Sequence, residues 1–228
     1  MTAIDTLFPN KPPKLVMFDL DGTLVDSIPD LATAIDSMLH HLDRPAAGIE
    51  KVRLWVGNGA STLVKRALAD SLNETDLDTV PADVYEEGYK NFLIQYNKVN
   101  GEKTTLYPGV IEILTKLAVD ECIVAVVTNK PGRFTDQILS KLGIHFNYVI
   151  SGDTLDKKKP DPDQLSYCMQ EANCTAAETL MIGDSKSDVM AAKAIHVPVI
   201  CVSYGYNHGE SIHDASPDAV IDSLIELL

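Results

Sequence analysis

Short apolar runs rich in β-branched residues alternate with helical patterns along most of this 228-residue chain, and this alternation is what most constrains its fold. The strand-like runs cover residues 15–18, 123–127, 148–150, 179–182 and 197–202. Helical patterns between the later runs cover residues 110–119, 134–142, 164–172 and 188–194. Because continuous apolar strands separated by helices are typical of a parallel sheet covered on both faces, the sequence predicts an α/β fold.

The stretch from residue 27 to residue 100 is different, because its helical patterns have no strand between them. One face of its first helical segment carries Leu31, Ile35, Met38, Leu39 and Leu42. Helical patterns then continue over 60–68 and 81–96, and a turn at 107–109 marks the return of the alternation. We therefore expect an all-helical domain at residues 25–103, inserted into a core formed by residues 1–24 and 104–228, with hinges near 25–27 and 103–105.

The charge of the chain limits its partners. It has 19 basic and 33 acidic residues, which gives a formal net charge of −14. A surface this negative repels nucleic acid and anionic lipid, so we expect no nucleic-acid or membrane partner. It also repels an anionic substrate, and any phosphate site must therefore carry local positive charge. The charge leaves open whether the chain is a monomer or a homodimer.

The cysteines and the N-terminal segment bear on location. Cys122, Cys168, Cys174 and Cys201 form no CxxC pair and no Cys/His spacing for a metal, and we expect Cys122 and Cys201 to be buried. Residues 1–14 lack the apolar region of a secretion signal, and no apolar run approaches the ~20 residues that span a bilayer. A cytoplasmic location is expected.

Polar clusters follow the predicted strands, at residues 19–23, 128–130 and 183–188, and a fourth lies at 157–160. Ligands of open parallel sheets bind beyond the carboxyl ends of the strands. We therefore expect these clusters to converge on one cleft.

Asp19 and Asp21 lie two residues apart at the end of the first strand, and Gly22 allows a sharp turn after them. One carboxylate of such a pair can attack phosphorus while the other reaches the leaving oxygen. Covalent catalysis of this kind divides a very high barrier into two steps. Taken alone, the segment also fits a plain turn in which Asp21 caps a helix.

Asp184 follows the strand-like run 179–182 and would add a third carboxylate beside Asp19. A cluster of hard oxygen ligands suits Mg²⁺, so Asp184 is a candidate metal ligand. Asp188, one helical turn further on, is better placed to orient a ligand than to be one. Asp184 or Ser185 as the N-cap of a helix is the competing interpretation.

Thr128 and Lys159 are candidate phosphate ligands, and Asn129 joins them as a candidate substrate contact. The Thr128 hydroxyl can donate to a phosphoryl oxygen, although a threonine at the end of a strand is more often structural. Lys159 supplies the cation that the charge argument requires, although a lysine run is more often a solvated loop. Lys157 and Lys158 are weaker candidates.

The helical insertion is expected to set specificity. Gly57 and Gly59 leave room for a close backbone approach on either side of Asn58, and we take Gly57 and Asn58 as candidate substrate contacts. A plain turn between helices is equally consistent. Trp55 is expected in the core of the insertion, and Lys65 and Arg66 on a solvated face rather than at a substrate carboxylate.

Together, 19–23, Thr128, Lys159-Pro160 and 183–188 resemble the four motifs of the haloacid dehalogenase superfamily, in order and at strand ends. The helical stretch resembles the C1 cap of that superfamily. Further segments resemble the phosphoglycolate phosphatases within it: 55–60, 106–109, 128–131 and 203–206.

The resemblance implies a Rossmann-like core, with Asp19 as nucleophile and Asp21 as general acid and then base. Mg²⁺ would be held by the Asp19 carboxylate, the Asp21 carbonyl and Asp184. Thr128 and Lys159 would bind the phosphoryl group of a small phosphorylated metabolite, with phosphoglycolate as the expected substrate.

Other functions stay open on this basis. A sugar-phosphate phosphomutase would share all four motifs. A dehalogenase of the same superfamily would lack a carboxylate at the position of Asp21. A phospho-aspartate signalling receiver, which is not an enzyme of this kind, would lack the helical insertion.

Overall fold

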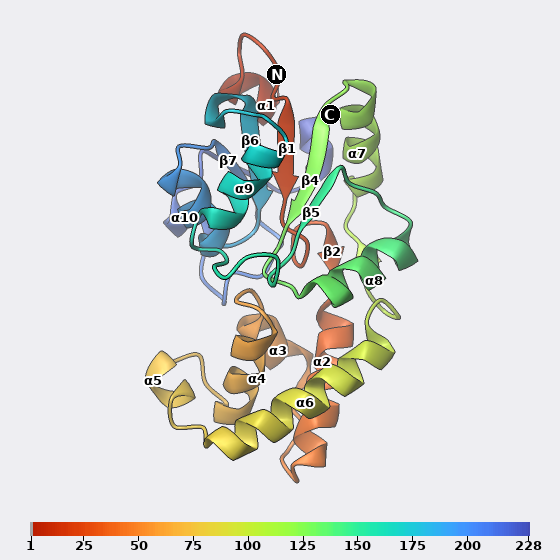
Figure 1. Cartoon of the computed structure of the whole chain (residues 1–228), viewed down its shortest axis with the longest axis vertical. Helices are drawn as coiled ribbons and strands as arrows, with labels where there is room; N and C mark the ends of the chain where they lie inside the picture. The colour runs from red at the N-terminus through yellow and green to blue at the C-terminus, as the bar shows by residue number, and fades with distance from the viewer. Residues whose placement is uncertain (1) are drawn as a thin grey trace.

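The computed structural model describes residues 2–228, and Figure 1 shows a sheet-containing core above a separate group of helices. The sheet has six strands in the order β5-β4-β1-β6-β7-β8, and every neighbouring pair is parallel. The strands are β1 (Leu15–Phe18), β4 (Ile123–Val127), β5 (Tyr148–Ile150), β6 (Thr179–Gly183), β7 (Val199–Val202) and β8 (Ala219–Ile221). The fold is thus the α/β, Rossmann-like architecture that the sequence predicts.

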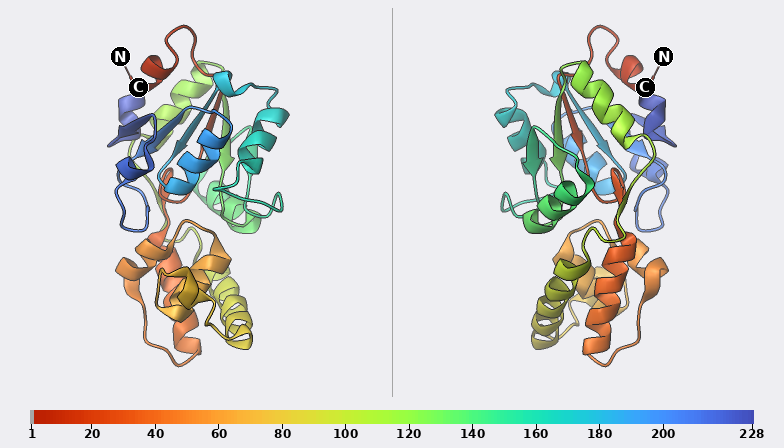
Figure 2. Two further views of the ribbon diagram at one scale, coloured as in Figure 1. Left: turned by 90° about the vertical axis from the view of Figure 1, so that its left-hand side faces the viewer. Right: turned by 90° about the vertical axis from the view of Figure 1, so that its right-hand side faces the viewer.

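Helices cover both faces of this sheet, as the side views in Figure 2 show. The covering helices are α7 (Val110–Val119), α8 (Gly132–Leu142), α9 (Asp163–Glu171) and α10 (Lys186–Ala194). Alternate residues of β1 face opposite sides: Val16 and Phe18 pack in one apolar cluster with residues of α7 and α8. Leu15 and Met17 pack in another with residues of α9 and α10. All four β1 residues are fully buried, which explains why this strand has no polar alternation.

The remaining helices lie between residues 28 and 99 and share an apolar cluster of their own. They are α2 (Ile28–His41), α3 (Gly48–Trp55), α4 (Ala60–Ala69), α5 (Glu74–Leu77) and α6 (Ala82–Val99). The centre of this cluster includes Ile35, Met38, Trp55 and Phe92. We keep the division into core and cap as a proposal and call residues 25–103 the cap below.

The cap is joined to the core by two short strands that pair antiparallel, β2 (Val25–Asp26) and β3 (Thr105–Leu106). Asp30, which is fully buried, ties the returning chain to α2, because its carboxylate accepts hydrogen bonds from the backbone N–H groups of Gly101, Lys103 and Thr104. The two connections between cap and core are therefore held side by side at the residues expected to act as hinges.

Some elements differ from the sequence prediction. Strand β7 begins at Val199, whereas the sequence predicts a strand from Val197, because Pro198 has no N–H to donate to a neighbouring strand. The prediction omitted β2, β3, β8, α3 and the short helices α1 (Ala3–Leu7) and α5, besides 3₁₀ turns at Ala176–Glu178, Ile212–Ala215 and Leu224–Leu227. Cys201 is buried as expected, whereas Cys122 is only partly buried, and all four cysteines are free. Among residues 2–228, no helix combines the length and the apolar character needed to cross a membrane.

Candidate active site

The carboxyl ends of β1, β4 and β6 lie next to one another, because β1 sits between the other two in the sheet. Asp19, Thr128 and Asp184 follow these strands directly. Lys159 reaches the same place from the loop between β5 and α9. The structure therefore brings together the polar clusters that the sequence predicts to converge.

Lys159 is the cation at the centre of this group, and only 3% of its surface is exposed. Its Nζ donates to Val127 O at 2.6 Å and to Asp188 Oδ1 at 2.7 Å, and it lies 3.0 Å from Asp19 Oδ1. Burial disfavours its charge, but Asp188 and Asp19 outweigh burial and raise the pKa of Lys159. Lys159 therefore stays protonated, as the charge argument from the sequence requires.

Three carboxylates surround this lysine. One oxygen each from Asp19, Asp184 and Asp188 lie within 4.8 Å of one another. Burial is the largest cause that raises the pKa of Asp19, to about 6, although Lys159 opposes it. Burial, and then the charges of Asp19 and Asp188, raise the pKa of Asp184 well above its usual value. The single positive charge of Lys159 cannot balance three carboxylates, so this group keeps an excess of negative charge.

The donor set fits a hard dication such as Mg²⁺. Asp19 Oδ1 is buried and has no hydrogen-bond partner among the described residues, since its contact with Lys159 lacks hydrogen-bond geometry. Asp184 is held in place by Thr23 Oγ1, which donates to Oδ1 at 2.9 Å, and by Tyr206 N, which donates to Oδ2 at 2.6 Å. Asp19 and Asp184 therefore present oriented carboxylates that a cation would neutralise.

Asp188 has a different position in the group. Its Oδ1 accepts from Lys159, and its Oδ2 accepts from Ser185 Oγ at 2.7 Å and from Ser185 N at 3.0 Å. Ser185 and Asp188 form a capping box at the start of α10, so the helix-cap interpretation also holds, for Ser185 rather than Asp184. With both oxygens engaged, Asp188 fits a role in orienting Lys159 and the loop of Asp184.

Asp21 is bound by two side chains. Ser27 Oγ donates to its Oδ1 at 2.5 Å, and Lys130 Nζ lies 3.0 Å from Oδ1 and 3.1 Å from Oδ2. Lys130 Nζ also donates to the hydroxyl of Tyr96, on α6 of the cap, at 2.6 Å. Lys130 and Tyr96 were not among the residues singled out from the sequence. The sequence signals for Lys130 were its place in the same polar cluster as Thr128 and in segment 128–131, which resembles phosphoglycolate phosphatases.

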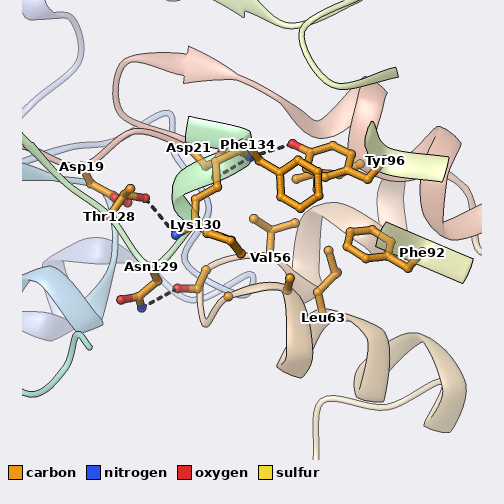
Figure 3. A pocket seen from close by; sticks show the side chains of 15 residues that line it. Asp19, Asp21, Val56, Leu63, Phe92, Tyr96, Thr128, Asn129, Lys130 and Phe134 are labelled. Carbon is orange, nitrogen blue, oxygen red and sulfur yellow. Dashed lines mark hydrogen bonds and ion pairs between the residues drawn. The ribbon is translucent and has the colours of Figure 1, made fainter. Parts of the chain in front are cut away.

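A cavity of about 40 Å³ opens between cap and core and is lined by Asp19, Asp21, Thr128, Asn129 and Lys130 (Figure 3). From the cap, Gly57, Gly59, Ala60, Tyr96 and the apolar side chains of Leu31, Val56, Leu63 and Phe92 complete its wall, together with Pro131 and Phe134 of the core. Asn129 connects the cap to the core, because its Nδ2 donates to Gly57 O of the cap at 3.2 Å and to Lys159 O of the core at 2.8 Å. Gly57 and Asn129 thus both line this cavity, and their contact with substrate stays a prediction.

Asn58 does not line this cavity. Its side chain lies 3.5 Å from Ser187 Oγ in a second cavity that Arg66 also lines, so its expected contact with substrate does not follow from its position. Trp55 is buried in the cap core, as expected. The expectation of a solvated face for Arg66 is wrong: it is 8% exposed, and its Nη1 donates to Trp55 O at 2.6 Å because the preceding helix ends there with a free carbonyl.

Known proteins resemble this chain over nearly its whole length. Residues 16–202 match the family model described as haloacid dehalogenase-like hydrolase. A phosphoglycolate phosphatase of Pseudomonas syringae pv. syringae is 49% identical over 230 residues, covering 100% of this chain and 83% of the relative. One of Nitrosococcus oceani is 46% identical over 219 residues, covering 95% of this chain and 96% of the relative.

Among solved structures, the crystal structure of a predicted phosphoglycolate phosphatase from Haemophilus somnus superposes with a TM-score of 0.87 at 34% identity. That match covers 94% of this chain and 96% of the other.

Proposed function

Since this chain belongs to the haloacid dehalogenase-like hydrolase family and is a phosphoric monoester hydrolase, we propose that it hydrolyses 2-phosphoglycolate to glycolate and phosphate. The observation that carries the proposal is the meeting of Asp19, Asp184 and Lys159 at one edge of the sheet, beside a cavity that Asp21 also lines. The names of the relatives supply the substrate.

In the proposed reaction, Asp19 attacks phosphorus and forms an aspartyl-phosphate while the bond to the alkoxide oxygen breaks. Asp21 gives its proton to that oxygen and then takes a proton from the water that hydrolyses the intermediate. Thr128 and Lys159 hold the phosphoryl oxygens, and Lys159 stays positioned through Asp188. A placed acid or base supplies only about 10²–10⁴ of the acceleration, so most of it must come from the nucleophile and the charges around it.

Mg²⁺ would be held by the Asp19 carboxylate, Asp184 and the carbonyl of Asp21, and when bound it would act as a Lewis acid and offset the carboxylate charge. The uncompensated charge of the three carboxylates supports this proposal. The cytoplasmic location expected from the sequence stays a prediction.

The size of the cavity favours a small substrate over a sugar phosphate. A single water needs roughly 10–15 Å³, so a cavity of about 40 Å³, whose wall includes Asp19 and Thr128, has room for only a few water-sized groups in all. A phosphomutase acting on a sugar would need more space. A carboxylate at position 21 disfavours a dehalogenase, and the helical cap disfavours a signalling receiver.

A panel of phosphorylated metabolites tests the proposal, with released phosphate measured in the presence of Mg²⁺. We expect the highest kcat/KM for 2-phosphoglycolate. A clearly higher kcat/KM for a sugar phosphate would refute the proposed substrate while leaving the reaction type intact.

A further inference from the structure

We propose that Lys130 and Tyr96 form the subsite that binds the carboxylate of the substrate. This inference rests on the proposed function, because it assigns the end of the substrate that does not react. It concerns the pair that joins core and cap across the cavity, with Lys130 from the loop after β4 and Tyr96 from α6.

The hydrogen bonds of the pair leave one donor unused, the hydroxyl of Tyr96. A lysine ammonium has three N–H donors, and that of Lys130 donates to both oxygens of Asp21, at 3.0 and 3.1 Å, and to the Tyr96 hydroxyl at 2.6 Å, so all three have acceptors. The Tyr96 hydroxyl accepts that bond, and within residues 2–228 its own proton has no acceptor. Burial, followed by the charges of Asp21 and Asp30, raises the pKa of Tyr96 well above its usual value, so the hydroxyl keeps this proton.

One buried donor with no acceptor, the hydroxyl of Tyr96, therefore lies at the cavity wall beside the positive charge of Lys130. Lys130 is 5% exposed and Tyr96 is 2% exposed, so bulk water cannot readily accept the free proton of Tyr96. A carboxylate only accepts hydrogen bonds, so it can accept the free proton of Tyr96, and its negative charge matches the ammonium of Lys130 beside it. A sugar hydroxyl would also bring a proton of its own and would match it less well.

The surroundings of the pair make it selective for charge. Among the described residues that line the cavity, Lys130 is the one cation beside the two carboxylates of Asp19 and Asp21. The wall near the pair is otherwise apolar, formed by Phe92, Phe134 and Leu63 (Figure 3). Figure 3 places Asp19 and Thr128 on one side of Lys130 and Tyr96 on the other, so a short substrate with its phosphoryl group at Asp19 extends toward the pair. In such apolar surroundings a charged hydrogen bond is stronger than in water.

The competing interpretation is that Lys130 only positions Asp21. In that case its loss would slow the reaction of every phosphate ester to the same degree. The test therefore compares 2-phosphoglycolate with 2-hydroxyethyl phosphate, which has the same length and lacks the carboxylate. The ratio of the two kcat/KM values reports recognition of the carboxylate alone.

We expect wild type to prefer 2-phosphoglycolate. Lys130→Met and Tyr96→Phe should each reduce the ratio by roughly 10- to 100-fold, since hydrogen bonds to charged groups have that magnitude. Tyr89→Phe, a change on the same helix outside the cavity, is the matched control and should leave the ratio unchanged. If Lys130→Met is inactive on both esters or does not fold, the ratio of kcat/KM values in Tyr96→Phe decides. A second measurement supports it: calorimetry gives the dissociation constants of both esters for Asp19→Asn and for the double variant Asp19→Asn with Tyr96→Phe.

An unchanged ratio in Tyr96→Phe, or an equal loss for both esters in Lys130→Met, overturns the carboxylate subsite and leaves the proposed function standing. A wild type that hydrolyses both esters equally well has the same consequence. Failure to hydrolyse 2-phosphoglycolate, with turnover of other esters in the panel, instead refutes the proposed substrate and the subsite with it.

Discussion

Metal-free protein should lose stability as pH rises, through the ionisation of Asp19. Its side chain is 14% exposed, and burial raises its pKa to about 6 from the usual value of 3.8. Between these values the folded state holds a proton that the unfolded state has released. Stability from this group is therefore present below the unfolded pKa and is lost as pH rises through the folded pKa.

The size of the effect follows from the two pKa values. Between about pH 5 and about pH 7.5, a shift of this size changes the free energy of unfolding by ~1.4 kcal/mol. For a chain of this length that corresponds to roughly 3–6 °C in Tm. Charged groups elsewhere also titrate, so the diagnostic quantity is the difference in pH dependence between wild type and Asp19→Asn, which has no titratable group at this position.

The assay is thermal or urea unfolding in EDTA at both pH values for the two proteins. Relative to Asp19→Asn, we expect wild type to become less stable by about that amount at the higher pH. Added Mg²⁺ should restore wild type more than the variant, because the cation favours the ionised carboxylate. Identical pH dependence of the two metal-free proteins would refute the claim that Asp19 ionises at the expense of folding.

The other predictions concern catalysis. Asp19→Asn should abolish turnover, and Asp21→Asn should slow it by roughly 10²–10⁴ or more, as measured by phosphate release; most activity remaining in Asp19→Asn would contradict a nucleophilic role. Activity should disappear in EDTA and return with Mg²⁺, and metal-independent turnover would exclude Asp184 as a ligand. Gly205→Ala should raise the Mg²⁺ concentration for half-maximal activity by about 10- to 100-fold, because the new Cβ would overlap Asp184. Gly88→Ala, whose Cβ would approach nothing closer than 3.3 Å, should leave that concentration unchanged.

The strands, and the meeting of most candidate site residues at one edge of the sheet, could be predicted from the sequence because their signals are local. β1, β4 and β5 match the predicted runs, since each is a short segment of buried apolar residues. Asp19, Thr128 and Asp184 come together because parallel strands align their carboxyl ends at one edge, a rule that needs no knowledge of side-chain packing.

The contacts between core and cap could not be predicted in this way. The bond between Lys130 and Tyr96 joins residues 34 positions apart in different elements, and no periodicity encodes such a pair. Arg66 was assigned to a solvated face because charged residues are mostly exposed, whereas the free carbonyl of Trp55 satisfies its guanidinium inside the fold. The paired strands β2 and β3 have only two residues each, too short for a pattern.

The pairing of β2 with β3 also affects how such a chain can change over time. Val25 lies opposite Leu106, and Tyr107 N donates to Leu24 O at 3.0 Å, so the chain leaves the core and re-enters it at adjacent points. A segment with neighbouring ends can be lengthened, shortened or exchanged without pulling the sheet apart. Evolution can thus change the cap side of the cavity wall by replacing residues 25–103, while the core residues around Asp19 stay unchanged.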